Sequence, residues 1–275
     1  MGRVIFIGAG PGSADLITLR GAQRLASADV VLADALTDPA LRSLAPGARW
    51  IGVGKRGFQS STAQARIDAW LVALARRHPV VVRLKGGDPS VFGRLEEELQ
   101  ALAAAGIDCE VVPGVTAALA AAADLRLPLT RRGRGRSVAL STAMSREHEL
   151  SVGAHADTEV FYMAGRQLGA LGRRLRMAGW PHATPVQVVS RAGWPDAHAS
   201  AHTVGSLAEA SVLHAGRPAV VTVGVGAMPL DPSIAPTGLP RTAALPGDGS
   251  SPPRTGLSVA QGFDAEQPGW HPLTN

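Results

Sequence analysis

The sequence predicts an α/β protein made of two α/β domains, and three observations support this fold class. Short runs rich in β-branched residues alternate with longer segments rich in Ala, Leu and Arg, the pattern of repeated β-α units around a mostly parallel sheet. A glycine-broken, Arg-rich stretch at residues 129–136 separates two such series. The 275 residues are 45% hydrophobic and 18% charged, which is enough for a sizeable core and excludes disorder of the whole chain.

The first domain, residues 1–130, is expected to contain five strands with helices between them. The predicted strands are residues 4–7, 29–32, 49–53, 79–82 and 109–112. The predicted helices are residues 18–26, 39–44, 62–77, 95–104 and 116–124. This strand and helix order indicates one complete α/β unit.

The second domain, residues 137–230, repeats the pattern on a smaller scale. Its predicted strands are residues 137–140, 159–162, 185–189 and 219–223, and its predicted helices are residues 167–177 and 208–213. Beyond residue 230 the composition shifts to Pro, Gly, Ser and Thr without periodicity. We therefore expect residues 231–275 to be a disordered tail.

Composition restricts the partners and the location. The net charge is +5, and residues 231–275 hold only two of the basic residues, so the folded part is the basic part and favours an anionic partner. Aromatic residues make up 4%, too few for single-stranded nucleic acid, so a polycarboxylate or phosphorylated small molecule is preferred. A single cysteine, Cys109, and the absence of Cys or His clusters predict no metal and a reducing cytoplasmic location. No segment is long enough to span a membrane, and the apolar start is too short for a signal sequence.

The segment from Arg83 to Gly93 follows the fourth predicted strand and is the most informative stretch. Gly86 and Gly87 let backbone approach a ligand, and Asp88 can hydrogen-bond a hydroxyl or an amine. The alternative is a simple turn, since Gly, Asp and Pro are the common turn formers. Of the 27 basic residues only Lys55 and Lys85 are lysine, and both lie in glycine-flanked segments, which favours a role for a compact ammonium there.

The run Gly8-Ala9-Gly10-Pro11-Gly12 follows the first predicted strand and partly matches a dinucleotide-binding fingerprint. Ser13 stands where the third glycine of that fingerprint is required. Pro11 also removes an amide from a loop that would have to cradle pyrophosphate. The spacing therefore disfavours a nicotinamide-dependent dehydrogenase.

Asp34 follows the second predicted strand and is expected at the same sheet edge as the glycine loops. It can serve as a general base, or it can cap a helix or turn together with Asp38. Lys55 can bind an anion, take part in proton transfer, or face water. The residues alone leave these alternatives open.

Taken together, the motifs resemble those of the tetrapyrrole (corrin and porphyrin) methylases, most closely the members that act on uroporphyrinogen III. The resemblance covers about residues 3–230. It rests on an ordered set of motifs, namely Gly8–Gly12, Ala28–Asp34, Val53–Arg56, Val82–Pro89, Phe92–Arg94, Val112–Ala117, Pro128–Thr130, Phe161–Met163, Thr184–Val186 and Pro218-Ala219.

The resemblance implies a homodimer in which two α/β domains hold S-adenosylmethionine in a cleft between them. It further implies methylation of carbon atoms of a polycarboxylate tetrapyrrole in sirohaem or cobalamin biosynthesis. Carried over by position, the contacts to the methyl donor fall on Pro11, Gly86, Gly87, Asp88, Val91, Thr116, Ala117, Met163 and Ala192. On the residues alone, Met163 would be interpreted as core at a strand end.

By the same resemblance, Asp34 matches the proposed base and Lys55 the proposed proton donor. Arg56, Arg131 and Arg132 are expected to pair with substrate carboxylates, because guanidinium groups suit that geometry. The chain departs from the family pattern at Leu95, Arg131, Met144 and Gly193. These departures leave open another precorrin as the acceptor.

Two alternatives belong to other functional classes. One is a cofactor-binding protein without turnover, which the retained Asp34 and Lys55 disfavour. The other is a basic RNA-binding protein, which would need residues 131–136 to form a continuous basic face. We expect neither nucleic acid nor a membrane as a partner.

Overall fold

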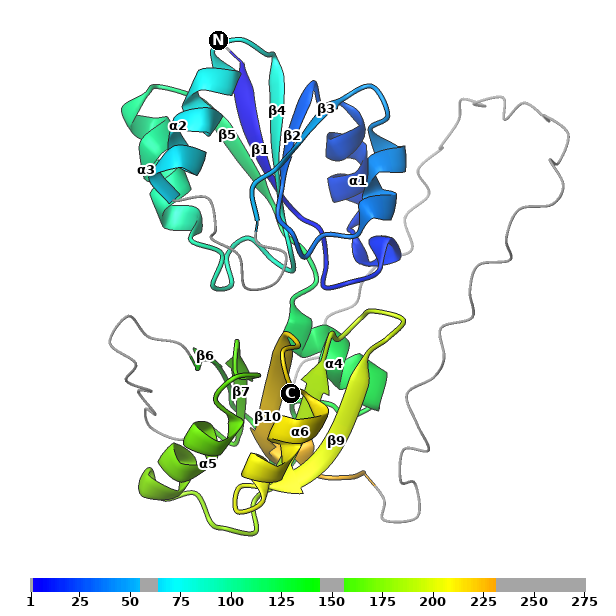
Figure 1. Ribbon diagram of the computed structural model, residues 1–275, viewed down its shortest axis with the longest axis vertical. Coiled ribbons are helices and arrows are strands. Elements are labelled where there is room, and N and C mark those ends of the chain that lie inside the picture. The colour runs from blue at the N-terminus through cyan, green and yellow to red at the C-terminus, as the bar shows by residue number, and fades with distance from the viewer. Residues whose placement is uncertain (1, 55–63, 144–155, 231–275) are drawn as a thin grey trace, which may run out of the picture. The chain divides into compact units, whose positions relative to one another are not determined.

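The computed structural model describes residues 2–54, 64–143 and 156–230. These residues form two five-stranded sheets with helices packed on their faces, which confirms the predicted α/β class (Figure 1). The predicted tail lies outside the described residues. The predicted domain boundaries remain a prediction.

The first sheet has the strand order β3-β2-β4-β1-β5, and all its pairs are parallel, as the sequence predicted. Its strands are β1 (Arg3–Gly8), β2 (Val30–Ala33), β3 (Arg49–Gly52), β4 (Val80–Lys85) and β5 (Cys109–Val112). The central strands β1 and β4 are buried on both faces, which is why they carry uninterrupted apolar runs, Val4–Ile7 in β1 and Val80–Val82 in β4, rather than alternating ones.

Helices cover both faces of this sheet (Figure 1). Helices α2 (Gln64–Ala75) and α3 (Leu95–Ala104) pack against one face, where Ile67, Leu71 and Leu102 meet Val4 and Phe6. The other face is covered by α1 (Leu19–Ala26) and by two 3₁₀ helices, η1 (Ala14–Leu16) and η2 (Pro39–Leu44). Because both faces are covered, ligand access is left to the ends of the strands, and ligands of open α/β sheets bind at the carboxyl ends.

Strand β4 is longer than the sequence predicted. Arg83, Leu84 and Lys85 were expected in the loop, but they continue the strand, and Gly8 is paired with Lys85 in the β1–β4 register. Charged residues inside a buried strand run against the hydrophobic pattern. They are accommodated here because the carboxylates of Glu98, which is buried, and Asp34, which is partly exposed, pair with them.

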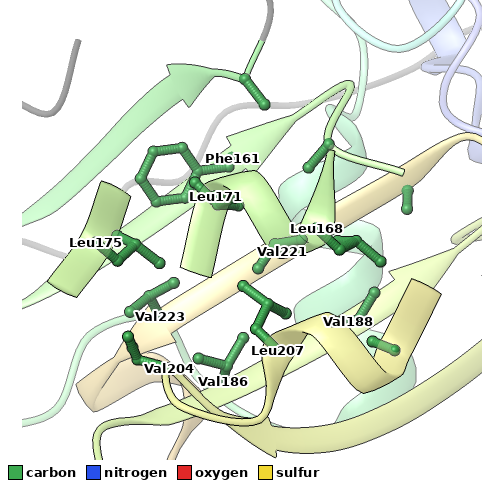
Figure 2. Packing of buried hydrophobic residues seen from close by; sticks show 14 residues of the cluster. Phe161, Leu168, Leu171, Leu175, Val186, Val188, Val204, Leu207, Val221 and Val223 are labelled. Atoms are coloured by element: carbon green, nitrogen blue, oxygen red, sulfur yellow. The ribbon is translucent and has the colours of Figure 1, made fainter. Parts of the chain in front are cut away.

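The second sheet has the order β6-β7-β10-β8-β9. Its strands are β6 (Val138–Thr142), β7 (Thr158–Tyr162), β8 (Pro185–Ser190), β9 (His198–Thr203) and β10 (Ala219–Gly224). One face packs against α5 (Leu168–Met177), η3 (Leu207–Glu209) and α6 (Ala210–Leu213), with Phe161 and leucines of α5 and η3 in a common cluster (Figure 2). A further 3₁₀ helix, η4 (Val225–Ala227), follows β10.

The prediction of a mostly parallel sheet is wrong for this half. Only β6 and β7 are parallel, whereas β10 runs antiparallel to β7 and β8, and β8 runs antiparallel to β9. The β8–β9 connection spans only residues 191–197, too short for the crossover that parallel strands require. Strand β9 itself was not predicted, because its sequence, HASAHT, contains one β-branched residue.

Helix α4 (Ala117–Leu125) was expected to complete the first domain. Its buried residues, including Ala118 and Ala121, instead share a cluster with Val160 of β7 and Val220 of β10. The helix therefore packs on the second sheet, on the face opposite α5. In the described part of the chain, no helix is long and apolar enough to cross a membrane.

Candidate functional site

Two glycine-containing loops meet at the carboxyl edge of the first sheet. The amide of Gly10 donates to the carbonyl of Gly87 (3.3 Å), and the amide of Gly87 donates to the carbonyl of Gly10 (2.9 Å). The amide of Ala9 donates to the carbonyl of Lys85 (2.8 Å). Ligands of open α/β sheets bind at this edge, so the pairing fixes the backbone where a ligand site is expected.

The surface at Gly86 and Gly87 is open. Gly87 has a φ of +71°, and a Cβ added there would meet its nearest atoms, in Val115 and Thr116, only at 3.9–4.0 Å. A Cβ added to Gly86 would lie 3.4 Å from the side chain of Leu36, which is itself 50% exposed. A ligand can therefore approach the backbone of both glycines, which a side chain at Gly87 would prevent.

Asp88 joins this loop to the next one. Its Oδ2 accepts a hydrogen bond from the amide of Gly114 (2.8 Å), and its Oδ1 accepts one from the amide of Ser90 (2.8 Å). Gly114 has no room for a side chain, because a Cβ there would lie 2.4 Å from the carbonyl oxygen of Gly87. Asp88 thus holds the loop that leads to Thr116 and α4 against the glycine loop.

Tyr162, at the end of β7, holds the start of α4 and forms a second wall of the candidate site. Its hydroxyl lies 2.7 Å from Oγ1 of Thr116 and accepts a hydrogen bond from the amide of Ala118 (3.3 Å). Its ring lies 5.1 Å from that of Phe92, which is 42% exposed. Burial raises the pKa of Tyr162, although the hydrogen bond with Thr116 opposes the shift, so the phenol stays protonated at neutral pH.

The predicted donor contacts Val91, Ala117 and Ala192 pack in one cluster together with Tyr162. Met163 follows Tyr162 with a φ of +56° and is 45% exposed, so it is not the buried core residue that its position at a strand end favoured. Neither Tyr162 nor Phe92 was predicted as a site residue from the sequence. The only sequence signal for a role of these two residues was that each lies next to a predicted donor contact, Val91 or Met163.

Pro11 is in contact with the loop that follows β8. A Cβ added to Gly193 would lie 2.0 Å from the carbonyl oxygen of Pro11, and the carbonyl of Gly193 accepts a hydrogen bond from the amide of Ser13 (2.9 Å). Gly193 has a φ of +75°, and its amide donates to Oδ2 of Asp124 (3.0 Å). The close approach and the left-handed backbone both require glycine at this position.

Asp34 lies at the same edge as the glycine loops, as predicted. Its amide donates to the carbonyl of Leu84 (3.0 Å), and its side chain is 30% exposed. Its Oδ1 accepts a hydrogen bond from Nη2 of Arg83 (2.6 Å), and Nε of Arg83 donates to Oε1 of Glu98 (3.0 Å). Asp38, by contrast, caps η2 through the amide of Ala40 (2.8 Å), so the capping role belongs to Asp38.

Lys85 is a buried partner of Glu98 rather than a group of the ligand loop. Its Nζ lies 2.6 Å from Oε2 of Glu98, and both residues are almost fully buried. Burial and the nearby positive charge of Arg83 lower the pKa of Lys85, while Glu98 opposes the shift. Burial alone would also lower the pKa of Arg83, but the charges of Asp34 and Glu98 raise it overall.

The sequence of residues 3–209 matches the family model of the tetrapyrrole (corrin/porphyrin) methylases. The chain belongs to this family. The uroporphyrinogen-III C-methyltransferase of Pseudomonas aeruginosa is 38% identical to this methylase over 232 residues, which are 81% of this chain and 93% of the relative.

Two solved structures resemble the fold of this methylase. One is a uroporphyrin-III C-methyl transferase from Thermus thermophilus complexed with S-adenyl homocysteine, with a TM-score of 0.72 and 36% identity, covering 82% of this chain and 98% of that one. The other is a cobalt precorrin-4 methyltransferase, described as a cobalamin biosynthetic enzyme. It has a TM-score of 0.72 and 30% identity, and the match covers 82% of this chain and 96% of that one.

All predicted donor contacts of this methylase lie within the described residues, but only some of its predicted substrate contacts do. Lys55, Arg56 and the departure at Met144 lie outside the described residues. The residue before Lys55, Gly54, packs beside the residue after Asp34, since a Cβ on Gly54 would lie 2.2 Å from the amide nitrogen of Ala35. The roles of Lys55 and Arg56 stay predictions.

Arg131 and Arg132 border an open pocket of about 530 Å³, which is also lined by Thr130, Gly133, Gly135 and Arg136. The guanidinium of Arg131 donates to the carbonyls of Met228 and Pro229, beyond η4. Arg132 is exposed. No group of three or more His, Cys, Asp or Glu in the described part of this methylase is arranged to hold a metal ion.

Proposed function

We propose that this methylase transfers methyl groups from S-adenosylmethionine to carbon atoms of uroporphyrinogen III, giving precorrin-2 by way of precorrin-1. The observation that carries the proposal is the open glycine surface at Gly86 and Gly87, where an added Cβ would meet no atom closer than 3.4 Å. The similarity to methyltransferases that act on uroporphyrinogen III supports the choice of acceptor. The product would feed sirohaem or cobalamin synthesis.

The residues at this edge fit S-adenosylmethionine by size and polarity. A methyl at Gly87 would occupy otherwise open space, and Leu36, Phe92 and Met163 offer exposed apolar surface to an adenosine group. We assign the donor contacts to Pro11, Gly86, Gly87, Asp88, Val91, Thr116, Ala117, Met163 and Ala192. Of these, Asp88 and Thr116 are already held by partners within the protein, which pre-organises the wall that they form.

When bound, the sulfonium supplies an activated methyl group, so the protein needs no strong acid for this transfer. The contribution of this chain is alignment of donor and acceptor, which can account for much of the rate of a two-substrate reaction. The acceptor gains a methyl group and must lose a proton. We assign the proton to Asp34, whose second carboxylate oxygen accepts no hydrogen bond from a described residue.

Lys55 is the proposed proton donor, and Arg56, Arg131 and Arg132 are the proposed partners of substrate carboxylates. Arg131 already donates to two backbone carbonyls, so its remaining donors would have to serve the substrate. We also propose that the protein works as a homodimer in the cytoplasm. Light scattering of the purified protein tests the dimer directly.

A second acceptor class is supported by a specific observation. The chain is 30% identical to a cobalt precorrin-4 methyltransferase and departs from the family pattern at Leu95, Arg131, Met144 and Gly193. The alternative is therefore methylation of a later precorrin by the same donor site. Offering both acceptors to the same preparation separates the two proposals.

The test is anaerobic incubation with S-adenosylmethionine and freshly generated uroporphyrinogen III, with mass detection of the product. We expect a doubly methylated product from the wild-type chain. Donor binding measured by calorimetry with S-adenosylhomocysteine, without any methylated product from uroporphyrinogen III, would refute the proposed acceptor but not the donor site.

Asp34→Asn tests the base. We expect turnover to fall about 100-fold or more, because general base catalysis contributes on this scale, with S-adenosylhomocysteine affinity unchanged. Asp108→Asn, at an exposed position just before β5 and at the amino edge of the sheet, is the matched control and should retain full turnover. Equal losses of turnover and donor affinity in Asp34→Asn would argue against a base.

A further inference from the structure

Arg83 is a buried guanidinium in the middle of the first sheet. Its side chain is 4% exposed, and its hydrogen bonds are made within the protein. Nη2 bonds Asp34 (2.6 Å) and Nε bonds Glu98 (3.0 Å), while Nη1 bonds the carbonyls of Leu32 (3.4 Å) and Leu84 (3.2 Å). Hydrogen bonds from all three of its nitrogens therefore fix the planar guanidinium group in place.

Glu98 fixes Arg83 from the side of α3. Its side chain is 0% exposed, and its two oxygens are divided between two cations. Oε1 binds Arg83, and also accepts from Nε2 of Gln64 (3.3 Å), whereas Oε2 binds Nζ of Lys85 (2.6 Å). The four charged groups balance, with two cations and two carboxylates.

Stability alone does not account for such a network. Removing charged side chains from water has a large free-energy cost for each ion, and well-packed apolar residues often give equal or greater stability. Arg83, Lys85 and Glu98 are almost fully buried, and only Asp34 is accessible, with 30% of its side chain exposed. The network therefore holds one accessible carboxylate, that of Asp34, in a fixed orientation.

We propose that Arg83, clamped by Glu98, is a positioning residue that orients the carboxylate of Asp34 toward the tetrapyrrole. Arg83 occupies Oδ1 of Asp34 and so directs Oδ2 to the substrate side. Arg83 does not itself touch the substrate, because its guanidinium is enclosed by the sheet and α3. This inference rests on the proposed methylation and on Asp34 as its base.

The test is a double-mutant cycle between Arg83 and Asp34, measured in single turnover with product detection by mass. Arg83→Met should lower the methylation rate about tenfold or more in the wild-type background, because small misplacements of a reacting group are costly. In the Asp34→Asn background the same substitution should change the rate by less than about twofold. Affinity for S-adenosylhomocysteine should be unchanged in all four proteins.

Arg83→Lys keeps the test valid if Arg83→Met does not fold. It retains the charge, but one ammonium cannot bond Asp34 and Glu98 in the two directions that the guanidinium spans. We expect it to fold, to lower the rate with Asp34 present and to have no effect in the Asp34→Asn background. Arg24→Met is the matched control, since it removes a partly exposed ion pair with Glu110 and should not change the rate.

The outcomes separate this inference from the proposed function. A rate loss of the same factor with Asp34 intact and in the Asp34→Asn background would show that Arg83 acts on folding or on another group, and would overturn the inference while methylation stands. A wild-type chain that binds S-adenosylhomocysteine but methylates no tetrapyrrole would overturn the proposed function and this inference together.

Discussion

At the residue scale, backbone with positive φ is concentrated beside the predicted donor contacts. Phe92 (+52°) follows Val91, Met163 (+56°) follows Tyr162, and Arg191 (+53°) precedes Ala192. Side chains other than glycine adopt this conformation at a cost, and such positions often occur at functional sites. At Phe92 this backbone conformation accompanies a ring placed 5.1 Å from that of Tyr162.

Gly87→Ala tests the open glycine surface. The substitution places a methyl in the donor site on left-handed backbone, so we expect about 1 kcal/mol less stability and about tenfold weaker binding of S-adenosylhomocysteine. Gly106→Ala is the matched control, because Gly106 has a similar φ of +66° and open surroundings away from the site. Calorimetry and urea unfolding measure the two effects.

The control should lose similar stability and bind the ligand normally. If both variants bind S-adenosylhomocysteine as the wild type does, Gly87 does not border the donor. If both lose affinity equally, backbone strain rather than the occupied space is responsible.

At the element scale, α4 shows why small residues were needed. The helix presents Ala118, Ala120 and Ala121 to the second sheet, and its first residues contact Tyr162 through Thr116 and the amide of Ala118. Small side chains allow the helix to approach the sheet closely enough for these hydrogen bonds. The position of the site wall therefore depends on the packing of this helix.

Ala121→Leu should destabilise the protein by about 1–3 kcal/mol, because added methylene groups overpack a buried site. Ala123→Leu, on the exposed side of the same helix, should change stability by less than about 0.5 kcal/mol. Urea unfolding of both variants measures the difference. Equal stabilities would contradict the assigned helix face.

Some helices and strands were predictable from the sequence, and others were not. Helices α1, α3 and α5 lie within a residue or two of their predicted bounds, because their apolar residues recur with helical spacing. The sequence did not predict that α4 packs on the second sheet, since a helix of mostly alanine fits many surfaces. It also missed β9 and the strand direction of β10, which depend on pairing between distant segments.

At the scale of the whole molecule, a buried histidine links global stability to pH. His214, at the end of α6, is fully buried, and its Nε2 lies 2.8 Å from Oγ of Ser200, which also lies 2.7 Å from Nε2 of His202. Burial, followed by the charges of His198, His202 and Arg217, lowers the pKa of His214 to about 4. The native protein therefore holds this imidazole neutral at neutral pH.

Because the folded pKa lies below the unfolded value of 6.5, the unfolded chain binds the extra proton between these values. Stability therefore falls as the pH falls from about 6.5 toward 4, and His214 accounts for about 2 kcal/mol of that loss at pH 5. In His214→Gln, the drop in unfolding free energy between pH 7.5 and pH 5 should be smaller by this amount. Urea unfolding at the two pH values measures it.

His182→Gln, at an exposed histidine, is the control and should keep the wild-type pH dependence. If His214→Gln loses as much unfolding free energy between pH 7.5 and pH 5 as the wild type does, then either His214 is already protonated in the native state or other groups cause the loss of stability.

The candidate site was predictable in part. The sequence placed Asp34, Gly10 and Gly87 at one sheet edge, because each follows a strand of a parallel sheet, and the structure confirms this placement. Tyr162 and Gly193 were missed as site residues. Their roles depend on contacts with Thr116 and Pro11, which are far away in the sequence and leave no local pattern.

The sequence by itself determined the α/β class, the parallel first sheet and the glycine loops at its carboxyl edge, because hydrophobic periodicity and glycine placement are local properties. Only the tertiary structure decided that Lys85 is a buried partner of Glu98 and that Arg83 holds Asp34. Charged residues at the end of a hydrophobic strand are compatible with a loop or with a buried network. The partner that compensates each charge comes from another element, so only the folded chain distinguishes the two.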